Sequence, residues 1–91
     1  MSPRPPARHP VAGEPVRVWP AVGGAPHEFI WRGQRFRVRS VEREGAGRAV
    51  AGAWVLRYRV RTRTGLRCVL TQDPSAGTWR MDRLMAAGGS T

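Results

Sequence analysis

The feature that most constrains the fold is an alternation of apolar and polar residues with a period of two. It is clearest over Ala53–Thr62, where two sets of side chains interleave. The first set is Trp54, Leu56, Tyr58 and Val60, and the second is Val55, Arg57, Arg59 and Arg61. Because successive side chains of a strand point to opposite faces, the pattern predicts a strand with one face in the core. No window of about 12 residues carries the apolar stripe of an amphipathic helix, so the sequence predicts an all-β protein.

Turn residues divide the rest of the folded region into further strands. We expect a short strand over Val16–Trp19, a hairpin over His27–Arg43 and a last strand over Thr78–Met85. The end of that last strand, from Asp82, is also compatible with a turn of helix. The Gly/Ala-rich stretch Glu44–Gly52 predicts a loop, and the five residues from Asp73 to Gly77 are a strong turn signal.

The turn of the first hairpin predicts how its two strands pair. Glycine at the first loop position favours a type II′ turn at Gly33-Gln34. With that loop, Trp31 would pair with Phe36 and Phe29 with Val38.

A second turn predicts the pairing of the next two strands. Arg63-Thr64-Gly65 fits a three-residue turn with glycine in the left-handed conformation. With that turn, Val60 would pair with Cys68 and Tyr58 with Leu70. The core face predicted from the two turns and the last strand holds Phe29, Trp31, Phe36, Val38, Trp54, Leu56, Tyr58, Val60, Leu66, Cys68, Leu70, Trp79 and Met81.

These segments predict five short strands in an antiparallel meander, curled into a small, partly open barrel that is SH3-like in size. Residues 15–85 are expected to form this single β domain, which at such a length has one modest core. Residues 1–14 are rich in proline and arginine and are expected to be a disordered basic arm. Residues 86–91 are expected to be a flexible tail.

The chain is strongly basic. Sixteen basic residues, all of them arginine, face six acidic residues and give a formal net charge of +10. GC-rich coding can account for arginine in place of lysine, but it does not account for the excess of positive charge. A field of this sign attracts polyanions such as nucleic acid.

Alternation collects many arginines on the face opposite the core. Arginines two residues apart on a strand lie about 6.5–7 Å from one another, a spacing close to the phosphate repeat of a single nucleic-acid strand. Arginines at alternate positions form one row over residues 35–39 and a second row over residues 57–63. If the two strands are neighbours, the two rows merge into one cationic surface. The alternative is an ordinary solvated sheet face, which also carries charge. The residues predicted to bind nucleic acid are Arg32, Arg35, Arg37, Arg39, Arg57, Arg59, Arg61 and Arg63. Since nearly all aromatic residues are assigned to the core, with Trp19 as the exception, contact with the backbone is expected rather than recognition of bases.

The sequence predicts no catalytic, metal or cofactor site. Cys68 is assigned to the core face, where cysteine acts as a small apolar residue. His9 lies in the expected arm and His27 at a strand entrance, so no His/Cys/Asp cluster has metal-ligand spacing. The glycine-rich stretches lack the strand-to-helix context of a phosphate-binding loop. We therefore expect a protein that is not an enzyme and takes no small-molecule substrate.

Cysteine content and hydropathy bear on location. With one cysteine the chain cannot form an internal disulfide. Its apolar runs are too short for a signal peptide or a membrane span. A cytoplasmic protein without membrane contact is therefore expected.

Two hairpin sequences carry a resemblance to a known family. They are His27–Val38 (HEFIWRGQRFRV) and Asp73–Arg80 (DPSAGTWR). The first resembles the F-x-W-R-G-R-x-Y-x-V hairpin, and the second the D-P-x-x-G-x-W hairpin, of a family of small actinobacterial domains of unknown function. Val16-Arg17-Val18 fits the opening strand of that family, whereas Gly45–Gly52 differs from its longer, tryptophan-bearing connections. A related domain ends the catalytically inactive Y-family-polymerase-like proteins of the actinobacterial mutasome, which implies a setting in DNA repair or translesion synthesis.

These observations predict a non-enzymatic binding module that contacts the nucleic-acid backbone through an arginine-rich sheet face. The resemblance favours DNA over RNA and implies a protein partner from a repair complex. The alternative is a protein–protein interaction module, an adaptor that binds an acidic partner or adds a strand at a sheet edge.

Overall fold

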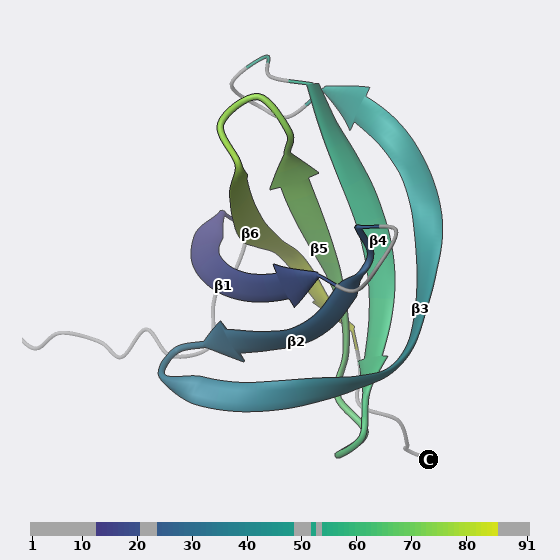
Figure 1. Ribbon diagram of the computed structural model, residues 1–91. Coiled ribbons are helices and arrows are strands. Elements are labelled where there is room, and N and C mark those ends of the chain that lie inside the picture. The colour runs from purple at the N-terminus through teal and green to yellow at the C-terminus, as the bar shows by residue number, and fades with distance from the viewer. Residues whose placement is uncertain (1–12, 21–23, 49–51, 53, 86–91) are drawn as a thin grey trace, which may run out of the picture.

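The computed structural model describes residues 13–20, 24–48, 52 and 54–85. Over these residues it contains six strands, which pair in sequence order and close into an antiparallel barrel (Figure 1). The strands are β1 (Glu14–Pro20), β2 (Pro26–Trp31), β3 (Gln34–Arg48), β4 (Trp54–Thr62), β5 (Arg67–Asp73) and β6 (Thr78–Met85). The predicted tail, and the predicted arm up to residue 12, lie outside the described residues.

The all-β prediction is confirmed, but the prediction of five strands in a partly open barrel is wrong. The predicted segments already amount to six strands, because the hairpin over His27–Arg43 contains two of them, β2 and β3, so the number five is a miscount. The barrel closes because β1 pairs along both of its edges. Arg17 to Pro20 pair with β2, and Glu14 to Val16 pair with Met81 to Trp79 of β6.

Strand β3 is the longest element and bends around the barrel (Figure 1). Its first part pairs with β2 and its second part with β4. The register with β4 shifts between Val38 and Ser40 and again between Arg43 and Gly45, and such bulges bend a strand and increase its twist. The bend turns the outer face of β3 from one side of the barrel to another.

The Gly/Ala-rich segment that was predicted as a loop from Glu44 is strand as far as Arg48. Gly47 pairs with Val55 of β4. A Cβ atom on Gly47 would lie 2.8 Å from Nη1 of Arg57, so glycine leaves room for the Arg57 side chain. The small residue at position 47 therefore accommodates a side chain of β4, and the strand continues through it.

The first hairpin turns one residue earlier than predicted. Its loop is Arg32-Gly33, and both residues have positive φ, 53° and 78°, as in a type I′ turn. Phe29 consequently pairs with Phe36, and Trp31 with Gln34. The pairing differs from the predicted one by two residues, so every side chain keeps its face, and Phe29, Trp31 and Phe36 are buried as predicted.

Contacts to Glu14 of β1 hold Arg32 in its left-handed conformation, which a non-glycine residue adopts at a cost. Arg32 Nε donates to Oε1 of Glu14 at 2.8 Å, and Trp31 Nε1 donates to the same oxygen at 2.9 Å. The Arg32 guanidinium also lies 4.6 Å above the centre of the Trp31 ring. The hydrogen bond from Arg32 is the main cause that holds the pKa of the Glu14 carboxyl below its usual value.

The later turns are as predicted. Val60 pairs with Cys68 and Tyr58 with Leu70, and Gly65 has a φ of 100°. In the next turn, the Asp73 carboxylate accepts hydrogen bonds from the backbone N–H groups of residues 75 and 76. The helical alternative for the end of the chain is wrong, because β6 remains paired with β5 as far as Met85.

The core confirms the predicted inner face except at its margin. Phe29 stacks on Phe36 with ring centroids 5.1 Å apart, and Tyr58 packs on Trp79 at 5.5 Å. Trp54 was predicted to be buried and is instead 54% exposed. Pairing of β4 with β5 begins only at Leu56, so Trp54 extends beyond the part of β4 that β5 covers.

Candidate nucleic-acid interface

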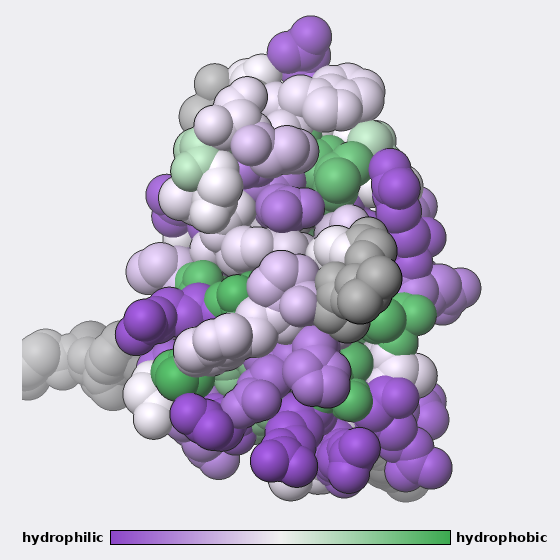
Figure 2. Space-filling model, viewed as in Figure 1, coloured by the Kyte–Doolittle hydropathy of each residue, from purple (hydrophilic) through white to green (hydrophobic). Residues whose placement is uncertain are grey.

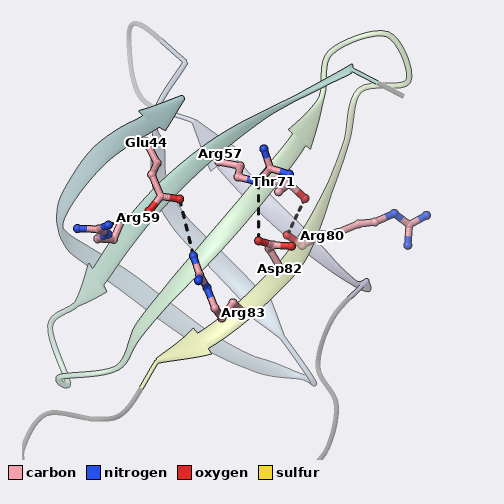
Figure 3. A network of polar contacts seen from close by, with 7 residues as sticks. All are labelled: Glu44, Arg57, Arg59, Thr71, Arg80, Asp82 and Arg83. Carbon is pink, nitrogen blue, oxygen red and sulfur yellow. Dashed lines mark hydrogen bonds and ion pairs between the residues drawn. The ribbon is translucent and has the colours of Figure 1, made fainter. Parts of the chain in front are cut away.

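Two groups of the described arginines differ in their ion pairs and position. Arg17, Arg43, Arg48 and Arg80 also form no ion pair with the described residues, and they belong to neither group. In the first group, acidic side chains lie next to the guanidinium groups on the outer face of the barrel. Figure 3 shows the largest such network, in which Glu44 of β3 lies between Arg59 of β4 and Arg83 of β6, at 2.8 and 3.9 Å. The other pairs are Arg32–Glu14, Arg35–Glu28, Arg57–Asp82 and Arg59–Glu42.

The second group gathers at one end of the barrel, and we call it the basic patch. No member of it forms an ion pair with any residue that the structure describes. Figure 2 shows hydrophilic residues collected over the lower end of the molecule, where β3 begins to bend and the β4–β5 turn lies. The basic patch consists of Arg37, Arg39, Arg61, Arg63 and Arg67.

The bend of β3 brings the patch together. Arg39 is the extra residue of the first bulge, between Val38, which pairs with Thr62, and Ser40, which pairs with Arg61. The backbone N–H of Arg63 donates to the carbonyl oxygen of Arg37 at 2.9 Å. These contacts fix the β4–β5 turn against β3 where β3 changes direction.

Positive side chains face one another inside the patch. Arg61 pairs directly with Arg67 on β5, and like charges in this cross-strand position repel. On its other side Arg61 faces Ser40, which carries no charge. Arg39, Arg61, Arg63 and Arg67 also line one hollow of about 280 Å³. The arrangement costs stability that a bound anion would restore.

Arg67 is the member of the patch that sequence analysis did not select. Its Nε atom is buried and has no hydrogen-bond partner among the described residues. It lies between the hollow and a cleft of about 540 Å³, which Glu42 and Met85 also line. The signal for Arg67 was present in the predicted register, because pairing Val60 with Cys68 places Arg61 opposite Arg67.

The eight arginines predicted from sequence are thus placed in two environments. Arg32, Arg35, Arg57 and Arg59 take part in ion pairs, whereas Arg37, Arg39, Arg61 and Arg63 belong to the basic patch. Strands β3 and β4 are neighbours, as the merging of the two rows requires. Their bulged register, however, places Glu42 opposite Arg59 and Gly45 opposite Arg57. The arginines of β3 and β4 therefore lie next to one another only where β3 bends.

Cys68 is fully buried in the core. Burial raises the pKa of its thiol to about 12, so the thiol is neutral at physiological pH. A neutral, buried thiol is a poor nucleophile. Because the folded state holds this proton more tightly than the unfolded state, its contribution to stability is complete below pH 9 and is lost as the pH rises towards 12.

We expect Cys68 to resist alkylation by iodoacetamide in the native protein at pH 8 and to react rapidly in denaturant. Mass spectrometry of samples quenched over time would measure both rates. Rapid modification of the native protein, with unchanged circular dichroism, would contradict the burial of the thiol.

Comparison with known proteins adds no family to this geometry: no family model matches the chain, and neither does any curated protein or solved structure. The part of the chain that the structure describes contains no helix of the length and hydropathy needed to cross a membrane. Over the same residues there is no group of three or more histidine, cysteine, aspartate or glutamate side chains that could hold a metal ion.

Proposed function

We propose that this protein binds the phosphate backbone of nucleic acid through the basic patch. The observation that carries the proposal is the convergence of Arg39, Arg61, Arg63 and Arg67 on one hollow with no acidic side chain lining it. Guanidinium groups bind phosphate oxygens through paired hydrogen bonds, and they remain charged at any physiological pH.

The distribution of acidic residues distinguishes this site from the ion-paired face of β4 and β6. Where arginines cover β4 and β6, Glu44 and Asp82 neutralise part of their charge. Near Arg61 and Arg67, β3 supplies Ser40 in the position opposite. The net charge of +10 attracts any polyanion over a distance. The basic patch is the site at which the phosphate backbone of the nucleic acid would bind.

The test is fluorescence anisotropy with labelled single-stranded DNA, double-stranded DNA and RNA at about 50 and 200 mM salt. If the five arginines each contact one phosphate of a single strand, the logarithm of affinity falls with the logarithm of salt with a slope of about −3.5. Affinity should then drop by about 100-fold between the two salt concentrations. The resemblance of the two hairpins leads us to propose DNA, in a repair or translesion setting, before RNA.

Two triple variants with equal loss of charge separate the patch from the general field. In the variant Arg39→Gln, Arg61→Gln, Arg63→Gln we expect the salt slope to become shallower by about 2 to 3. The matched control, Arg57→Gln, Arg59→Gln, Arg83→Gln, removes three ion-paired arginines and should keep most of the slope. Equal losses in both variants would show that net charge alone matters, and absence of binding at low salt would contradict the proposal.

A protein partner is the second candidate, favoured by the divergence of β1 from β6. The two strands pair only as far as Val16 and Trp79, and beyond that pair lies a groove of about 590 Å³ that Arg17 and Arg80 also line. An extended acidic segment could add there as a strand. Competition with polyglutamate of matched charge distinguishes the candidates, because the nucleic-acid proposal requires that the oligonucleotide bind far more tightly.

A further inference from the structure

Trp19 is a large aromatic residue exposed on the outer face of β1. Its side chain is 41% exposed, whereas its neighbours in the strand pattern, Val16 and Val18, face the core. The exposed part of this large aromatic side chain is apolar surface that the fold leaves in contact with water. The fold therefore presents an aromatic face that the core does not use.

The register connects Trp19 with the basic patch. Trp19 pairs with Glu28 of β2, and Glu28 pairs with Arg37 of β3, so the three side chains form one row across the sheet. Neighbouring strands are about 4.8 Å apart, which puts Trp19 roughly 10 Å from Arg37 across the sheet. Glu28, between them, is already paired with Arg35 at 3.0 Å.

Two guanidinium groups lie over the Trp19 ring at long range. The guanidinium carbons of Arg17 and Arg35 lie 5.8 and 5.9 Å from the ring centre, at the outer limit of a cation–π contact. The contrast is Trp31, which is buried and has Arg32 at 4.6 Å. Trp19 also borders the groove between β1 and the β5–β6 hairpin, which leaves room beside the ring.

We propose that the preferred ligand is a single-stranded nucleic acid. One of its bases stacks on Trp19, and the phosphates that follow lie along the basic patch, beginning at Arg37 and Arg39. Arg17 and Arg35 would hold the phosphates on either side of the stacked base. Bases of a duplex are paired and stacked on one another, so they cannot present a face to the indole. This inference rests on the proposed function and adds to it the strandedness of the ligand.

The experiment compares two oligonucleotides with the same number of phosphates, oligo-dT of about eight nucleotides and an abasic oligomer of the same length. We expect the native protein to bind oligo-dT about 10-fold more tightly than the abasic oligomer, because stacking one base on an aromatic side chain contributes a free energy of this size. Trp19→Ala should abolish this difference while leaving the affinity for the abasic oligomer unchanged, and Trp19→Phe should restore part of it.

Trp54→Ala is the matched control, since Trp54 is also exposed and lies near an arginine, Arg48 at 5.8 Å, but at the far end of β4. It should leave the preference for oligo-dT intact. Equal affinity of the native protein for both oligomers would overturn the role of Trp19 and leave the backbone proposal in place. Failure of both oligomers to bind would overturn the proposed function as well.

Discussion

Phe29→Ala is expected to lower the free energy of unfolding by about 3–5 kcal/mol. Phe29 is completely buried and stacks on Phe36, its cross-strand partner. Alanine would lose the transfer free energy of the ring and leave a cavity that a closed barrel cannot easily collapse to fill. Small domains are stable by only about 5–15 kcal/mol, so this one substitution would remove a large share of the total.

Urea denaturation followed by tryptophan fluorescence would measure the loss. Trp54→Ala removes an even larger aromatic side chain from an exposed site and should change stability by less than about 0.5 kcal/mol. A comparable loss in both variants would contradict the placement of Trp54 outside the core, and a small loss in Phe29→Ala would contradict the barrel interior.

Thr62→Val is expected to cost about 1–3 kcal/mol, although valine has nearly the same shape. Thr62 is buried at the end of β4, and its hydroxyl oxygen accepts a hydrogen bond from the backbone N–H of Leu66 at 3.0 Å. Valine would leave that N–H without its partner at the base of the β4–β5 turn. The same turn carries Arg63 and precedes Arg67, so the substitution should also reduce the affinity of the basic patch for oligonucleotides.

Hydrogen exchange of the Leu66 amide, together with urea denaturation, would test this prediction. Thr64→Val is the matched control, because Thr64 is exposed and its hydroxyl forms a hydrogen bond with that of Thr62 but not with the Leu66 backbone. It should change stability by less than about 0.5 kcal/mol. Unchanged exchange of Leu66 in Thr62→Val would show that the hydroxyl does not hold the turn.

Local sequence patterns predict the structure correctly where local chemistry decides it. The alternation in β4 and the turn at residues 63–65 gave the correct register with β5, because Gly65 adopts a left-handed conformation. The first hairpin was misplaced by one residue because the loop residue Arg32 is held by Glu14, eighteen positions away in the chain. No local pattern reveals such a partner.

The candidate site was anticipated only in part for the same reason. Alternation identifies which arginines face outward, and it did so for both long strands. It does not reveal the bulge at Arg39 or the placement of Glu42 and Glu44 beside Arg59. The pairing of strands decides which arginines are neutralised, and that pairing depends on contacts between residues far apart in sequence.

The pairing of β1 with β6 also sets the order in which the barrel can form. Glu14 pairs with Met81 and Val16 with Trp79, so this ladder joins the two ends of the described chain. The β4–β5 and β5–β6 hairpins close short loops and can form early, whereas the β1–β6 ladder joins residues far apart in sequence and therefore has a larger entropic cost of loop closure. We therefore expect the hairpin that carries Arg61 and Arg67 to form before the β1–β6 ladder closes the ring.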